Sequence, residues 1–132
     1  MLYIIIMSNI NDTTTQIIDK SSDKYKIALK FINKILTNIG KNEIDDLTKF
    51  VNVSRADVIS DTNKKTFEDM QDDLLELYDK TICGWYRRNK MQHYILSFIR
   101  GMCTQLGLAF TYKELKKQEN KVVVSTMYYS IK

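Results

Sequence analysis

The residues best suited to chemistry in this sequence are cations near its C-terminal end. Arg87 and Arg88 precede a helical pattern, and a polar stripe follows along that pattern at three- and four-residue steps. Guanidinium and ammonium groups on a helix face can bind phosphate, and a helix N-terminus favours anions through its dipole and unpaired N–H groups. The stripe consists of Lys90, His93, Ser97, Arg100 and Thr104.

Four lysines follow in and beside a polar turn, predicted at 116–121, between two segments of alternating pattern. Lysines at such a turn can contact a nucleic-acid backbone, but they also protect an edge strand against aggregation, and both explanations stay open. Phosphate binding requires the helix stripe and these lysines to share one contiguous surface. The predicted nucleic-acid contacts are Arg87, Arg88, Lys90, His93, Ser97, Arg100, Lys113, Lys116, Lys117 and Lys121.

Tyrosines accompany these cations in the two alternating segments. Tyr112, Tyr128 and Tyr129 could stack on the bases of a single strand, or they could lie in a protein interface. The sequence leaves both uses open.

Catalytic patterns are weak by comparison. His93 is the sole histidine, and Cys83 and Cys103 have neither metal-ligand spacing nor a CxxC motif. Cys83, close to two arginines, could in principle be an activated thiol, but a packing role is the stronger interpretation. The sequence therefore predicts no enzyme, no cofactor and no metal site, and reduced thiols of an intracellular protein.

Residues 45–58 resemble a helix-turn-helix, with Leu47 and Val51 as core positions of a first helix and Asn52 as the turn residue. The second helix would carry Asp57 and Asp61 in an acidic part of the chain, which should repel phosphate. A packing element without DNA contact is the favoured interpretation.

Charge divides along the chain. Residues 41–80 carry six Lys and Arg against eleven Asp and Glu, a net charge of −5, whereas residues 81–132 carry nine against two, a net charge of +7. This division makes the C-terminal part the expected site of anion contact.

The apolar spacing predicts helices after Ser22 up to Gly40, after Asn42 to about Val51, after Ser54, over about 62–79 and over 91–107. Alternating β-branched and aromatic residues then predict a hairpin over 108–131. We expect an α+β fold, a bundle of four to five helices closed by a C-terminal β-hairpin in a winged-helix-like arrangement. Residues 22–132 form the expected domain.

Residues 1–21 are expected to be a short strand or a disordered segment. Their apolar start, Met1–Met7, has no basic n-region and is far shorter than the roughly 18 residues that a membrane span needs. No membrane partner is therefore expected.

Three C-terminal segments carry a resemblance: 83–90 (CGWYRRNK), 94–103 (YILSFIRGMC) and 128–132 (YYSIK). Together they resemble the C-terminal part of small proteins of giant nucleocytoplasmic DNA viruses of the mimivirus kind. The resemblance implies an intracellular viral setting, either a viral factory in the host cytoplasm or a virion. It implies no catalytic activity.

These observations predict a non-enzymatic protein that binds nucleic acid, with duplex DNA as the expected partner. The alternative is a viral structural or adaptor protein that self-associates as a homo-oligomer through complementary acidic and basic surfaces, without nucleic acid.

Overall fold

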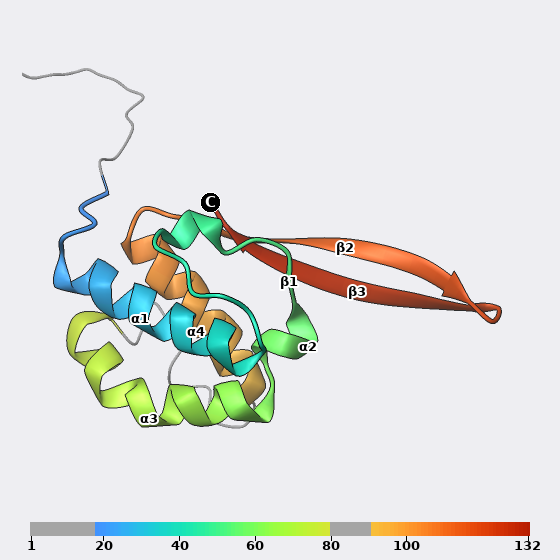
Figure 1. The fold of residues 1–132 in the computed structure, drawn as a ribbon, viewed down its shortest axis with the longest axis horizontal. Coiled ribbons are helices and arrows are strands. Elements are labelled where there is room, and N and C mark those ends of the chain that lie inside the picture. The colour runs from blue at the N-terminus through green and yellow to red at the C-terminus, as the bar shows by residue number, and fades with distance from the viewer. Residues whose placement is uncertain (1–17, 80–90) are drawn as a thin grey trace, which may run out of the picture.

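The computed structural model describes residues 18–79 and 91–132, and the side chains of the second range from residue 95 onward. Figure 1 shows a helical body from which a long β-hairpin extends. The elements are α1 (Asp23–Asn38), the 3-10 helix η1 (Leu47–Lys49), β1 (Val53–Ser54), α2 (Arg55–Val58), α3 (Asp61–Leu77), α4 (Met91–Gln105), β2 (Phe110–Glu119) and β3 (Val122–Ile131). The predicted α+β class, with helices first and a hairpin last, is confirmed.

Serine side chains begin three of the described helices, at Ser22 and Ser54 as the sequence indicated and at Ser60, which the sequence analysis did not single out. The hydroxyl of Ser22 accepts a hydrogen bond from the Tyr25 amide, and Ser54 and Ser60 cap α2 and α3 in the same way. Positive φ at Gly40 and Gly107 provides the left-handed residues that follow α1 and α4. The local signals at Ser22, Gly40, Ser54 and Gly107 therefore predicted these helix ends correctly.

The core lies between α1, α3 and α4, and each of these helices contributes a phenylalanine to its centre. The ring centroid of Phe31 lies 6.0 Å from that of Phe67 and 6.4 Å from that of Phe98, and the last two rings are 5.2 Å apart. All three rings are buried. Burial of aromatic rings at these spacings is a main source of stability for the body.

A three-stranded antiparallel sheet in the order β1-β3-β2 joins this body. The short β1 pairs Val53 with Tyr129 and Ser54 with Tyr128, at the base of the hairpin. There the ring of Tyr129 stacks on that of Phe110 with centroids 4.7 Å apart, and Ile131 is buried. The base of the hairpin is therefore part of the core.

Beyond its base the hairpin leaves the body. We call residues 112–127 the arm; none of them is buried. Its inner end, Ser125–Met127, lies beside α2, and its outer part extends away from the helices, where β2 and β3 contact each other (Figure 1). A ribbon that lacks a supporting layer exposes both of its faces to solvent.

Two sequence-based expectations about local structure were wrong. The helix expected from Asn42 to Val51 is only the three-residue η1, and Val51 is 55% exposed rather than in the core. The carbonyl of Phe50 instead accepts a hydrogen bond from the amide of Ile131 at 2.9 Å, which draws the following residues into β1. Residues 45–58 therefore do not form the helix-turn-helix that their pattern resembled.

The polar turn predicted at 116–121 was also too long. β2 runs to Glu119 and β3 starts at Val122, so the turn is the pair Asn120–Lys121, with φ of 48° and 67°. Positive φ at both central residues is typical of two-residue turns, which match the twist of a hairpin. Lys116 and Lys117 are strand residues, and their polar character concealed this from the sequence pattern.

Among the described residues, no helix has the length and apolar character needed to cross a membrane.

Candidate nucleic-acid interface

The first group of predicted contacts lies at the start of α4. Arg87, Arg88 and Lys90 lie outside the described residues, and so does the side chain of His93, whose backbone belongs to α4. The proposal that these groups bind phosphate stays a prediction.

The rest of the α4 stripe is at the surface of the body. Arg100 and Thr104 are exposed and Ser97 is partly exposed, while Phe98, Ile99 and other residues between them are buried. The hydroxyl of Thr104 donates to the carbonyl of Arg100 at 2.9 Å. The outer side of α4 therefore presents one guanidinium and two hydroxyls, a set that can contact phosphates and base edges.

The four predicted lysines of the hairpin all lie on the arm, but on different faces. Side chains alternate along a strand, so Lys113 and Lys117 share one face of β2 and Lys116 lies on the other. Lys121 is in the turn at the far end. The face with Lys116 continues the core-side face of the base, and the face with Lys113 and Lys117 continues its outer face.

Two glutamates reduce the positive charge of the arm. Glu114 accepts a hydrogen bond from the Ser125 hydroxyl across the strands, and Glu119 precedes the turn. With four lysines, the arm has a net charge of +2. This charge is spread over both faces and the tip.

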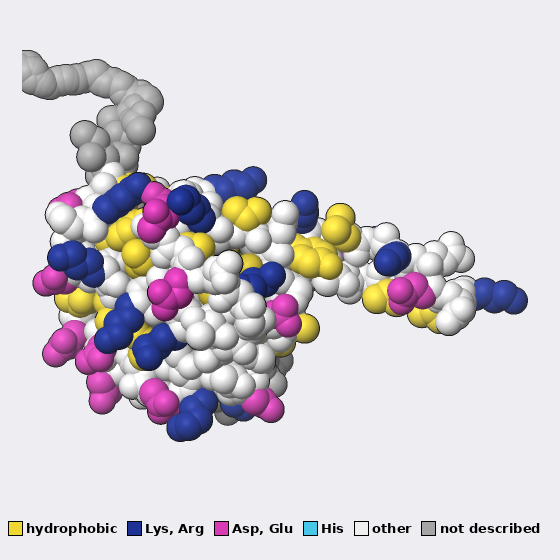
Figure 2. Space-filling model, in the orientation of Figure 1, with side chains coloured by type: hydrophobic (Ala, Val, Ile, Leu, Met, Phe, Trp, Pro, Cys, Tyr) yellow, Lys and Arg dark blue, Asp and Glu magenta, His cyan; other side chains and the backbone are white. Residues whose placement is uncertain are grey.

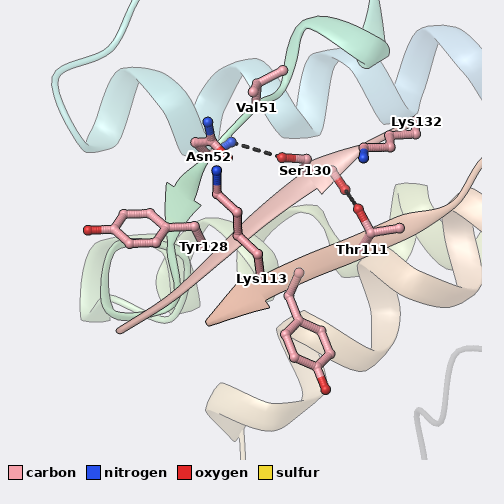
Figure 3. Close-up of a pocket in the computed structure, with 8 residues that line it drawn as sticks. Val51, Asn52, Thr111, Lys113, Tyr128, Ser130 and Lys132 are labelled. Atoms are coloured by element: carbon pink, nitrogen blue, oxygen red, sulfur yellow. Dashed lines mark hydrogen bonds between the residues drawn. The ribbon is translucent and has the colours of Figure 1, made fainter. Parts of the chain in front are cut away.

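At the outer face of the hairpin base, a shallow hollow of about 180 Å³ gathers two cations (Figure 3). Lys113 and Lys132 reach it from β2 and from the residue after β3, and Tyr128 also lines it. Lys113 is thus the predicted contact that the structure brings together with other donors. The lining residues are Val51, Asn52, Thr111, Tyr112, Lys113, Tyr128, Ser130 and Lys132.

Hydrogen bonds at the hairpin base, one of them from the loop before β1, fix the residues that line this hollow. The amide of Asn52 donates to the Ser130 hydroxyl at 2.9 Å, and the Thr111 hydroxyl donates to the carbonyl of Ser130 at 3.4 Å. Asn52 has φ of 55°, in the left-handed region that the sequence indicated for it. Sequence reasoning missed Lys132 and the role of Asn52 here, because only the pairing of β1 with β3 brings them to the hairpin.

The tyrosines divide between the core and the surface. Tyr129 is buried against Phe110, so it is not available for stacking on a base. Tyr112 is 57% exposed, and Tyr128 is partly exposed at the hollow. Of the three hairpin tyrosines, these last two are therefore the ones that can contact a partner.

Acidic side chains gather on another part of the body. Figure 2 shows Asp and Glu side chains grouped over α3, away from the arm. Within α3, six Asp and Glu stand against two Lys, a net charge of −4. A polyanion would therefore meet the arm rather than α3.

Groups suited to catalysis are few in the described part of the chain. Burial raises the pKa of the Cys103 thiol to about 12, which leaves it protonated and unreactive at neutral pH. The described residues contain no cluster of three His, Cys, Asp or Glu that could hold a metal ion. Cys83 lies outside them.

No family model, no curated protein and no solved structure matches this chain. Functional inference therefore rests on the geometry and charge described above.

Proposed function

We propose that this protein is a non-enzymatic binder of duplex DNA, a winged-helix-like domain in which the arm is the wing and α4 is the helix that faces a groove. The observation that carries the proposal is the arm: a two-stranded ribbon with four lysines that extends from the body (Figure 1). The order of elements supports it, since a helical body followed by a last helix and a hairpin is how winged-helix domains close. The short β1, which completes the sheet beside β3, fits the same arrangement.

Lysines on both faces of the arm suit a groove. A ribbon that lay flat on a surface would use one face alone, whereas here Lys116 and the pair Lys113 and Lys117 point to opposite sides. The two sides of a groove are lined by the phosphates of the two strands, so opposite faces can each meet one strand. Arg100 on α4 and the hollow at the hairpin base would add contacts along the same duplex.

The resemblance to giant-virus proteins is in keeping with this proposal, because a viral factory in the host cytoplasm and a virion both contain DNA. Charge contacts of this kind give affinity without sequence specificity.

The test is a salt series with a charge-removal variant. Each phosphate contact contributes about 0.9 to the slope of log affinity against log salt, so replacing Lys116, Lys117 and Lys121 by Gln should lower the slope by about 2.7. The wild type should then lose about 40-fold more affinity than the variant between about 50 and about 200 mM salt.

A matched control removes the same charge from α1. Lys26, Lys30 and Lys34 are exposed on one side of that helix, and their replacement by Gln should leave the slope within about 0.5 of the wild-type value. Equal slopes for both triple variants, or no duplex binding by the wild type at low salt, would contradict the proposal.

A further inference from the structure

The arm carries a set of exposed apolar side chains that phosphate binding does not use. Leu115 is 51% exposed, Val122 61%, Val123 64% and Val124 41%. By strand register, Leu115, Val122 and Val124 share the outer face, and Val123 lies on the opposite one. Apolar side chains grouped on a projecting ribbon are typical of a protein contact surface.

The described part of the body cannot cover this surface from within the same molecule. β1 reaches only Tyr128 and Tyr129, and α2 lies beside the inner end of the arm at Ser125–Met127, whereas the outer part of the arm points away from the helices (Figure 1). Within the described residues, Leu115 and the valines are therefore left open to a second molecule.

The outer side of α3 has the complementary charge. Glu68, Asp69, Asp72, Asp73 and Glu76 are all exposed there, and the ion pair seen among them joins Asp69 to the neighbouring Lys65 at 3.4 Å. Glu68 and Asp72, and likewise Asp72 and Glu76, are four residues apart, a spacing at which like charges destabilise a helix. Cations from a partner would relieve this repulsion.

The dimensions of the two surfaces also agree. α3 has 17 residues, which span about 25 Å, and the part of β2 from Tyr112 to Glu119 spans about 26 Å. Leu75 and Leu77 are partly exposed beside the carboxylates and could contact the valines.

We infer that the outer face of the arm of one copy lies along α3 of a second copy, with Lys113 and Lys117 over the carboxylates and with Leu115, Val122 and Val124 covered. This inference goes beyond DNA binding and does not depend on it. Because the same lysines would serve both partners, duplex DNA and a second copy would compete for the arm.

Charge reversal on each surface tests the pairing. An arm variant carries Lys113→Glu, Lys117→Glu and Lys121→Glu, and an α3 variant carries Glu68→Lys, Asp72→Lys and Glu76→Lys. Sedimentation equilibrium at low salt should show wild-type association above the 15.5 kDa of one chain. Each variant alone should associate about tenfold or more weakly, since three opposed pairs become repulsive.

Two combinations of these variants test whether the arm and α3 contact each other directly. An equimolar mixture of the arm variant and the α3 variant, and a single chain carrying all six substitutions, should both regain association, because opposite charges face each other again. The mixture and the six-substitution chain also control for misfolding, because a variant that does not fold would not restore association in either case. Circular dichroism of each variant checks the fold directly.

The inference fails if the wild type stays at 15.5 kDa at low salt, or if it associates and neither reversal weakens the association. It also fails if Val122→Thr and Val124→Thr together weaken DNA binding and leave association unchanged, which would assign the apolar side chains to DNA. DNA binding is measured separately in the salt series, so the two proposals can fail independently.

Discussion

The buried amide of Asn63 holds together the corner where α1, α2 and α3 meet. Its side-chain nitrogen donates to the carbonyls of Asp57 at 2.8 Å and Val58 at 3.3 Å, and its oxygen accepts from the Asn38 amide at 2.9 Å. The residue is completely buried. Its replacement by Ala would leave the Asp57 and Val58 carbonyls without this donor in a place that water does not reach.

The expected loss follows from these three hydrogen bonds. At about 1 kcal/mol each, Asn63→Ala should lower the free energy of unfolding by about 3 kcal/mol, a large part of the roughly 5–15 kcal/mol typical of a domain. For a chain of this length that loss corresponds to a fall in Tm of about 10 °C. The exposed Asn42→Ala is the matched control and should change stability by less than about 0.5 kcal/mol.

A second variant adds a pH signature. Asn63→Asp keeps the volume but places a carboxylate against two carbonyl oxygens, so the pKa of the new group in the folded state should be raised. Below the unfolded-state pKa of about 3.9 the new carboxyl group is protonated in both states and is tolerated. As the pH rises above that value, the free energy of unfolding of Asn63→Asp should fall. Urea denaturation of each variant at pH 3.5 and 7 measures these effects. A loss for Asn63→Ala no larger than that of the Asn42 control would show that the three hydrogen bonds of Asn63 do not stabilise this corner.

Three other predictions concern single side chains. In a Cys83→Ser background, Cys103 should react with a thiol reagent at pH 8 only as fast as the protein unfolds, and rapid labelling of the native protein would contradict its burial. Hydrogen bonds from Lys20 and Thr48 hold the pKa of Asp46 below its ordinary value, so Asp46→Ala should reduce stability by about 1 kcal/mol at pH 7, by chemical denaturation. That difference should narrow as the pH falls below about 4, because the unfolded chain then protonates Asp46 while the folded protein still holds it ionised; a constant difference would argue against the assignment. Tyr129→Ala should lower the free energy of unfolding by about 3 kcal/mol by removing the ring stacked on Phe110, and a thermal melt unchanged from wild type would show that the hairpin base is not part of the core.

Local signals made the helices and the hairpin predictable from the sequence. Ser22 and Gly40 bracket a strongly periodic segment, and Ser54 caps α2 as expected. Such signals depend on neighbours in the chain, so a sequence pattern contains them. The same holds for the alternation of the two hairpin strands.

Long-range pairing was not predictable in this way. β1 exists because Val53 and Ser54 meet β3, about 75 residues further along, and this pairing replaced the helix expected before Asn52. The hollow with Lys113 and Lys132 depends on the same contact. The strand register also places Lys116 on the opposite face from Lys113 and Lys117. The sequence did not indicate this, because residues 116–121 were expected to form a turn.

The most direct test of DNA binding through the arm and α4 is a titration of the isotope-labelled protein with a short duplex, followed by amide chemical shifts. DNA binding should shift the amides of β2, β3 and the turn at Asn120–Lys121, together with those on the outer side of α4 around Arg100, and should leave the amides of α3 unchanged. Shifts concentrated on α1 or α3, or no shifts at low salt, would contradict it.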